Sequence, residues 1–202
     1  MRVFGGTLQG RRLQTCRVAS LRPTSEKIRE AIFNILVPLL TEGPVLDLFA
    51  GTGSLGIEAL SRGMERAVFV ERNATIIPFL KKNISHCHLE EKSEVIAFPV
   101  SKGLKILKSR NEKFELIFLD PPYQEKLAGK TLLEISEAKL VTENGLVIAE
   151  HSSKEILEES YGRLKMDDQR TYGQTLVSFF YLYNVNMKRG FYGANCSVPR
   201  II

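Results

Sequence analysis

Short apolar runs alternate with helical patterns over most of the chain. The runs are short enough for strands and rich in apolar residues, which suits strands buried on both faces of a sheet. The predicted strands cover residues 45–49, 66–71, 94–98, 114–119 and 145–150. Between and after them, apolar positions recur every three or four residues, which predicts helices. The predicted helices cover residues 55–62, 73–84, 101–109, 126–138 and 154–159.

The end of this region breaks the alternation. Two predicted strands, residues 163–171 and 175–183, are separated only by a short turn at Tyr172-Gly173. A tight turn joins antiparallel strands, whereas parallel strands need a long crossover. We therefore predict an α/β fold: a doubly wound, mostly parallel sheet of seven strands with an antiparallel edge strand.

Segments of different character flank this region. Residues 1–23 alternate short apolar pairs with glycine and arginine, which predicts a small β-hairpin extension. Thr24 is a candidate N-cap for a helix that apolar spacing carries to Leu40, and Gly43 follows it. Residues 184–202 are polar, basic and without periodicity. The predicted parts are a basic extension over 1–23, a main domain over 24–183 and a basic C-terminal tail over 184–202.

Composition excludes several classes of protein. No apolar run approaches the ~20 residues that cross a bilayer, and the first residues lack a signal-peptide core. The three cysteines lie far apart, and an odd, scattered set is typical of reduced thiols. His86, Cys87 and His88 have no second ligand pair elsewhere, so we expect no metal site. We expect a cytoplasmic monomer without membrane contact.

The positive charge is concentrated at the N-terminus. The net charge is +5, and residues 1–30 alone, with seven basic and two acidic residues, account for all of it. Six of these seven cations are arginines, which suit bidentate contacts to phosphate. The tail after Tyr183 adds three cations, so residues 31–183 carry a net charge of −3. A basic N-terminal segment next to an acidic main domain indicates a polyanionic substrate.

The sequence Val-Leu-Asp-Leu-Phe-Ala-Gly-Thr-Gly-Ser-Leu-Gly over residues 45–56 predicts a strand, a glycine turn and a helix N-terminus. Such a turn lets the backbone approach a nucleotide-type ligand and offers free N–H groups. Asp47 lies inside the strand, where a carboxylate must be paired or hydrogen-bonded. It either supports the turn's amides, as in an ordinary dinucleotide-binding turn, or meets a cationic ligand. The second interpretation favours S-adenosylmethionine over NAD.

Glu71 ends the second predicted strand, 20 residues after Gly51. The carboxyl ends of neighbouring parallel strands meet at one edge of a sheet, where ligands bind in doubly wound folds. A carboxylate there can accept hydrogen bonds from both hydroxyls of a ribose. The alternative is an exposed glutamate at a strand end.

Asp120-Pro121-Pro122-Tyr123 ends the fourth predicted strand. The prolines stiffen the backbone and carry no N–H, so the Asp120 carboxylate and Pro121 carbonyl form a pair of acceptors. Such a pair suits an NH2 group, which has two donors. Tyr123 adds a ring on which a planar base can stack. The motif therefore predicts an aromatic amine held ready for group transfer, rather than a turn that only ends a strand.

Together these motifs resemble a known class. Val-Leu-Asp-Leu-Phe-Ala-Gly-Thr-Gly paired with Asp-Pro-Pro-Tyr is similar to class I S-adenosylmethionine-dependent amino-methyltransferases. The N-terminal sequences then resemble the bacterial 16S ribosomal RNA guanine-N2 methyltransferase family, the RsmD family. They are Gly5-Gly6, Gly10-Arg11-Arg12-Leu13, Arg22-Pro23-Thr24-Ser25 and Arg29-Glu30-Ala31-Ile32-Phe33-Asn34-Ile35-Leu36. The resemblance covers residues 2–183 and implies a Rossmann-like methyltransferase that acts on 16S ribosomal RNA, within a small-subunit particle.

The resemblance also implies roles for individual residues. Cofactor contacts are implied for Thr24, Arg29, Asp47, Phe49, Gly51, Gly53, Glu71, Arg72, Val100 and Ser101. Catalytic contacts to a flipped-out guanine are implied for Asp120, Pro121, Pro122 and Tyr123. RNA phosphate contacts are implied for Arg11, Arg12, Arg17 and Arg22. The chain lacks the acid that many class I enzymes carry after the third strand, so the Val100 backbone or the Ser101 hydroxyl would meet the adenine.

Other functions remain open at this stage. A DNA adenine-N6 methyltransferase would use the same Asp-Pro-Pro-Tyr sequence, although 202 residues leave little room for a separate recognition domain. A non-catalytic RNA-binding assembly protein could keep the fold, and an NAD oxidoreductase would have no use for the motif. His151 follows the strand 145–150 and lies either at the rim of the ligand site or, as we favour, on the ordinary surface.

Overall fold

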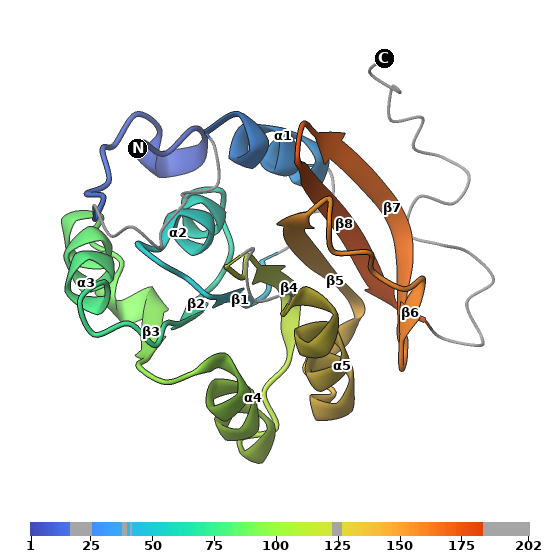
Figure 1. Ribbon diagram of the computed structural model, residues 1–202. Coiled ribbons are helices and arrows are strands. Elements are labelled where there is room, and N and C mark those ends of the chain that lie inside the picture. Colours follow the sequence, from blue (N-terminus) through green and yellow to red (C-terminus); the bar gives the residue numbers. More distant parts are fainter. Residues whose placement is uncertain (17–25, 38–39, 41, 123–126, 184–202) are drawn as a thin grey trace.

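The computed structural model describes residues 1–16, 26–37, 40, 42–122 and 127–183, and shows one sheet with helices on both faces (Figure 1). The eight strands lie in the order β3-β2-β1-β4-β5-β8-β7-β6. They are β1 Val45–Leu48, β2 Ala67–Val70, β3 Ser93–Ile96, β4 Phe114–Leu119, β5 Val141–Ser152, β6 Ser160–Tyr161, β7 Leu164–Tyr172 and β8 Thr175–Leu182. Strands β1 to β5 pair in parallel, and the β5–β8, β8–β7 and β7–β6 pairs are antiparallel.

The predicted number of strands was therefore wrong. The additional strand is β6, whose two residues pair with the start of β7. A strand of two residues has no alternation of apolar and polar positions that a sequence pattern can detect. The other seven strands lie at the predicted places, with ends that differ by a few residues.

The helices cover both faces of the sheet. They are η1 Gly6–Leu8, α1 Glu26–Leu36, α2 Ser54–Ser61, α3 Ile77–His86, η3 Glu90–Lys92, α4 Val100–Ser109 and α5 Ala128–Ala138. In Figure 1, α1 and α2 lie above the sheet and α4 and α5 below it. One buried cluster joins α1, α2 and α3 to one face, and a second joins α4 and α5 to the other.

The helix predicted over residues 154–159 does not form. The chain makes a turn and continues as an extended segment to β6. Glu155 is buried and Leu157 packs on the core, while Ile156 between them is 93% exposed. Six residues are also too few for a helix to form without strong tertiary support.

The first helix is shorter than predicted. α1 ends at Leu36, and the Leu40 N–H still donates to the Leu36 carbonyl at 2.9 Å. The predicted cap Thr24 lies outside the described residues.

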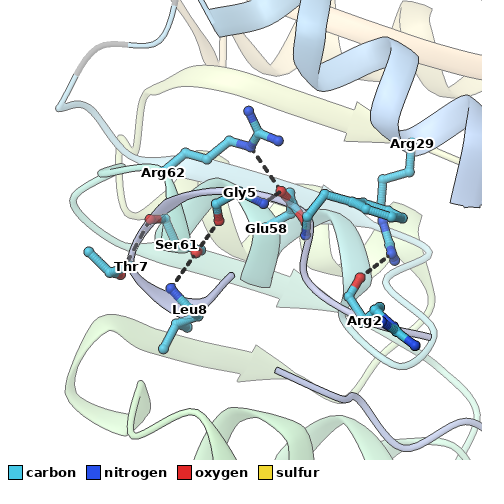
Figure 2. A network of polar contacts seen from close by, with 9 residues as sticks. Arg2, Gly5, Thr7, Leu8, Arg29, Glu58, Ser61 and Arg62 are labelled. Atoms are coloured by element: carbon cyan, nitrogen blue, oxygen red, sulfur yellow. Dashed lines mark hydrogen bonds and ion pairs between the residues drawn. The ribbon is translucent and has the colours of Figure 1, made fainter. Parts of the chain in front are cut away.

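The N-terminal segment is a hairpin in outline only. Arg2 and Arg12 form a single antiparallel bridge, and η1 occupies the loop between them. Figure 2 shows this segment fastened to α2: Glu58 accepts from the N–H groups of Phe4 and Gly5 at 2.8 and 2.9 Å. The Ser61 hydroxyl accepts from Leu8 N–H at 2.9 Å in the same way. Side chains of α2 thus supply the partners that a neighbouring strand would otherwise provide.

The described part of the chain lacks two kinds of feature. None of its helices is long and apolar enough to cross a membrane. It also contains no group of three or more His, Cys, Asp or Glu side chains placed to hold a metal ion. The division into three parts and the cytoplasmic location stay predictions.

Candidate functional site

The carboxyl ends of β1, β2, β3 and β4 form one edge of the sheet. The chain leaves β1 towards β2 and β3 on one side and returns as β4 on the other, so the order reverses between β1 and β4. Doubly wound sheets bind ligands at this reversal. Three predicted motifs follow these strand ends: the glycine turn after β1, Glu71 after β2 and Asp120 after β4.

The backbone after β1 has an unusual conformation. Phe49, Gly51 and Gly53 have φ values of 58°, 56° and 85°. Phe49 is not a glycine, so its positive φ is a strained conformation of the kind that concentrates at functional sites. At Gly53 an added Cβ would lie 2.5 Å from Leu80 Cδ1, and its positive φ also favours glycine. This turn leads directly into α2, whose first N–H groups have no partner within the helix.

Asp47 of β1 holds the segment after the strand by a hydrogen bond. It is 1% exposed, and its Oδ2 accepts from the Gly56 N–H at 2.9 Å. Burial raises the pKa of Asp47 to about 8; the Gly56 hydrogen bond opposes this and the charge of Glu71 adds to it. The structural role proposed for Asp47 is thus present, and its raised pKa marks a group that would gain from a cation beside it.

Glu71 contacts the same turn. Its Oε2 accepts from the Gly51 N–H at 2.8 Å, and its Oε1 accepts from the Asn73 N–H at 2.8 Å. Each carboxylate oxygen has a second lone pair, so both can still accept a hydroxyl. The alternative of an exposed strand-end glutamate is wrong, because Glu71 is buried.

Arg29 of α1 is completely buried beneath the N-terminal segment. Its Nη2 donates to the Arg2 carbonyl at 2.5 Å, and its guanidinium carbon lies 4.7 Å from the centre of the Phe4 ring (Figure 2). Its Nε and Nη1 are buried without a hydrogen-bond partner among the described residues. Burial lowers the pKa of Arg29, against the opposing charges of Glu58 and Glu26. Two unused donors on a buried cation indicate an anionic partner.

Asp120 lies beside the glycine turn. Leu119, the last residue of β4, pairs with Leu48, the last residue of β1, so Asp120 and Phe49 are the next residues along the same edge. Asp120 is half-buried and Pro121 is buried. The register therefore brings Asp120 and the glycine turn together at one edge of the sheet, where the sequence predicted both.

The remaining predicted site residues fall into three groups. Val100 and Ser101 open α4 directly after β3, on the same edge, and Arg72 is exposed next to Glu71. Arg11 and Arg12 lie on the N-terminal segment. Thr24, Tyr123, Arg17 and Arg22 lie outside the described residues.

The two described N-terminal arginines differ in their surroundings. Arg11 Nη1 donates to the His86 carbonyl at 2.5 Å, at the C-terminal end of α3, where a cation also meets the helix dipole. Arg12 is exposed, and the bridge places Arg2, which is also exposed, opposite it. Arg11 thus has a structural partner, whereas Arg2 and Arg12 form an exposed basic pair.

The prediction for His151 was wrong. It is fully buried, and its Nε2 lies 2.9 Å from the Ser178 hydroxyl. The sequence placed it after the last parallel strand, but β5 continues to Ser152 and β8 covers it. Burial lowers the pKa of His151, which favours the neutral ring.

Sequence reasoning also missed Asn83, which fastens the N-terminal segment to the glycine turn. Its Nδ2 donates to the carbonyls of Gln14 and Thr52 at 3.0 and 2.9 Å, and its Oδ1 accepts from Gln14 N–H at 2.7 Å. The available signal was a polar residue on the apolar stripe of α3, between Leu80 and Ile84.

Known proteins are similar to this chain in sequence and in fold. The family model described as conserved hypothetical protein 95 matches residues 1–181. A Bacillus subtilis (strain 168) protein named "Putative rRNA methyltransferase YlbH" is 40% identical over 180 residues, or 89% of this chain and 98% of that protein. "Ribosomal RNA small subunit methyltransferase D" of Haemophilus influenzae is 35% identical over 153 residues, or 74% of this chain and 78% of that protein.

A solved structure agrees with the fold. The crystal structure of a "putative methylase" from Haemophilus influenzae superposes with a TM-score of 0.73 at 29% identity, covering 91% of this chain and 98% of that one. The α/β architecture is thus that of class I methyltransferases, and the predicted fold class is confirmed apart from the eighth strand.

Proposed function

The chain belongs to the family described as conserved hypothetical protein 95, the RsmD family, and from this premise we propose that it methylates the exocyclic N2 of a guanine in 16S ribosomal RNA. It is an RNA methyltransferase with S-adenosylmethionine as its cofactor, as the sequence resemblance predicted. To this activity the proposal adds the methylated base (guanine), the methylated atom (N2) and the substrate, the small-subunit particle. The name of the Haemophilus influenzae relative supports the small subunit, and the chemistry of Asp120-Pro121 supports an amine.

The described residues near the glycine turn and on α1 fit this cofactor. Arg29 has two buried donors without a partner among the described residues, which suits a carboxylate. Asp47 and Glu71 form a buried acidic pair that a cation would stabilise. We assign the methionine end of the cofactor to Asp47 and Arg29, together with Thr24, and its ribose to Glu71. When bound, the cofactor supplies an electrophilic methyl group on a sulfonium.

Asp120 and Pro121 would hold the reacting amine. An amine on an aromatic ring is a weak nucleophile because its lone pair is delocalised into the ring. Two acceptors that bind its N–H groups favour a pyramidal nitrogen and aim the lone pair at the methyl group. Stacking on Tyr123 would fix the plane of the flipped-out base. We assign to Asp120 the further role of accepting the proton that the amine loses.

One observation carries this assignment. The pairing of Leu119 with Leu48 makes Asp120 and the glycine turn adjacent on one sheet edge. Methyl transfer needs the amine and the methyl donor in contact, and positioning of this kind supplies much of the rate. If the two motifs were on different edges, the chemistry could not take place.

The test compares methyl transfer and cofactor binding in one set of variants. The substrates are small-subunit particles, their free RNA and duplex DNA, prepared from cells without this protein. Asp120→Ala is expected to lower transfer at least about 100-fold and to leave cofactor affinity within about twofold. Glu143→Ala is the control, because this exposed carboxylate lies near the opposite end of β5.

The outcomes separate the candidate functions. Transfer to RNA that gives N2-methylguanine and depends on Asp120 supports the proposal. Transfer to adenine in duplex DNA would instead show the DNA methyltransferase. Cofactor binding without transfer to any of the three substrates would indicate a non-catalytic assembly protein.

A further inference from the structure

The glycine turn after β1 is held by side chains from other parts of the chain. Phe49 has a positive φ of 58° although it is not a glycine, and such a conformation persists only where surrounding contacts enforce it. Glu71, after β2, holds the turn through the Gly51 N–H at 2.8 Å. A second contact comes from α3, because Asn83 Nδ2 donates to the Thr52 carbonyl at 2.9 Å. The backbone of the turn is thus fixed at an N–H group and at a carbonyl.

The helix that carries Asn83 also packs against the turn. Leu80 and Asn83 are three residues apart, so they lie on the same face of α3, and both are fully buried. An added Cβ at Gly53 would lie 2.5 Å from Leu80 Cδ1. The apolar contact sets how closely α3 approaches the turn, and Asn83 adds a directional hydrogen bond at that place.

The amide of Asn83 is held in one orientation. Its Oδ1 accepts from the Gln14 N–H at 2.7 Å, and its Nδ2 donates to the Gln14 carbonyl at 3.0 Å as well as to Thr52. A rotation of the amide by half a turn would place its oxygen against two carbonyl oxygens and its NH2 against an N–H. Buried polar groups that lose their partners in this way are costly, so Gln14 fixes the direction of the donor that meets Thr52.

The N-terminal segment that contains Gln14 is attached independently to α2. Glu58 accepts from two of its backbone N–H groups, and the Ser61 hydroxyl accepts from a third. The segment is therefore fixed in place when it orients Asn83. Through this one side chain of α3, the segment supports a turn that lies far from it in the sequence.

We propose that Asn83 is a positioning residue for S-adenosylmethionine: oriented by Gln14, it holds the Thr52 carbonyl and keeps the glycine turn in the conformation that receives the cofactor. The inference rests on the proposed function, because it places the cofactor at this turn. It gives the N-terminal segment a part in cofactor binding, in addition to the nucleic-acid contacts predicted for its arginines.

The first experiment measures the affinity of the full-length protein for S-adenosylmethionine by titration calorimetry, without nucleic acid. Asn83→Ala removes the hydrogen bond to Thr52 and is expected to weaken binding about 3- to 15-fold, because the turn must then be ordered when the cofactor binds. Asn83→Asp has nearly the same volume but places an oxygen against the two carbonyls. We expect it to weaken binding at least as much as Asn83→Ala.

Ser61→Ala is the matched control. The Ser61 hydroxyl also makes two hydrogen bonds to the N-terminal segment, because it accepts from the Leu8 N–H at 2.9 Å and donates to the Gly5 carbonyl at 2.5 Å (Figure 2). Ser61 is the last residue of α2, at the opposite end of that helix from the turn. We expect Ser61→Ala to lower thermal stability and to keep cofactor affinity within about twofold. An equal loss of affinity in Ser61→Ala and Asn83→Ala would reduce Asn83 to general support of the segment and overturn the inference.

Hydrogen exchange in the wild type needs no substitution and no enzymatic activity. S-adenosylmethionine is expected to slow amide exchange in peptides that cover residues 49–56 and also in those that cover residues 10–15, which contain the Gln14 N–H. Slower exchange over 49–56 alone would overturn the inference, as would wild-type affinity in folded Asn83→Ala. Unchanged exchange over 49–56 would refute the placement of the cofactor and the inference with it.

These binding results are independent of the proposed methylation. If the wild type binds the cofactor but methylates no guanine in RNA, the proposed function fails. The affinities of the Asn83 and Ser61 variants and the exchange over residues 10–15 would still decide the role of Asn83.

Discussion

Asp47 is the side chain whose chemistry is most altered by its surroundings. A carboxyl group with a pKa of about 8 holds its proton at neutral pH when no ligand is present. A cation placed beside it favours the ionised form. Binding of a cationic cofactor and release of that proton should therefore be coupled.

This coupling gives a first prediction. Between about pH 6 and pH 8 the affinity for S-adenosylmethionine should rise with pH, by up to about tenfold per unit, as the proton becomes easier to release. Asp47→Asn removes the titrating group and should bind more weakly with a flatter profile. Titration calorimetry in buffers of different ionisation enthalpy measures the released proton. A wild-type profile as flat as that of the variant would contradict the assignment.

The same group predicts how stability depends on pH. The pKa of Asp47 is near 4 in an unfolded chain and about 8 in the folded protein. Between these values the folded state holds a proton that the unfolded state has lost, so raising the pH should destabilise the protein. The contribution is at most about 1.4 kcal/mol per pH unit. Urea unfolding between about pH 5 and pH 8 should show a smaller decline in Asp47→Asn, and parallel declines would refute this.

The sequence predicted where three candidate site residues lie, because a single short range contains both the strand and the side chain. Asp47 lies in β1, and Glu71 and Asp120 follow β2 and β4, while their roles stay predictions. Asn83 was missed because its partners Gln14 and Thr52 lie 69 and 31 residues away along the chain. Only the packing of whole helices and strands brings these partners together.

The N-terminal segment depends on close packing against α2. An added Cβ at Gly6 would lie 1.8 Å from the Ser61 carbonyl oxygen, and Gly6 has a φ of +76°. Gly6→Ala should therefore destabilise the protein by at least about 2 kcal/mol, through both overlap and backbone strain. Gly10→Ala is the control: its φ is +83° but its Cβ would meet nothing within 4 Å, so strain alone should cost about 1 kcal/mol.

Thermal or urea unfolding measures both glycine variants. Equal losses in the two would show that the segment moves away from α2 without cost. That result would remove the structural reason for Gly5-Gly6 at the start of the chain.

The basic residues of this segment should separate into two classes. Arg2→Ala and Arg12→Ala should each reduce the slope of log affinity for RNA against log salt by roughly 0.7 to 0.9. Arg11→Ala should leave the slope unchanged and reduce stability by about 1 kcal/mol, because its guanidinium is bound to the His86 carbonyl. A filter-binding series at several salt concentrations checks this. A reduced slope in Arg11→Ala alone would reverse the assignment.

Secondary elements were predictable to different degrees. Strands β1, β2, β4, β5 and β8 contain apolar runs long enough to identify, whereas β3 and β7 are more polar. The helix expected at residues 154–159 was wrong, because the chain turns there and Ile156 is exposed. β6 depends on pairing with β7, which no local pattern encodes.

The molecule as a whole combines a basic N-terminal segment with an acidic main domain. The regular alternation of strands and helices was sufficient to predict the parallel sheet, its two covering layers and the edge that carries the site. The alternation did not predict that the N-terminal segment is attached to α2 through Glu58 and Ser61, because polar contacts between distant segments leave no periodic signal. The site thus follows from the topology, and its supporting contacts follow from tertiary packing.

We propose that Asp120 and the glycine turn act together in the transfer of a methyl group to a guanine amine of small-subunit RNA. Mass mapping of modified nucleotides tests this most directly, in 16S ribosomal RNA from cells with and without this protein and from cells with the Asp120→Ala variant. We expect one N2-methylguanosine that is present only with the active protein. Identical modification in all three samples would contradict it.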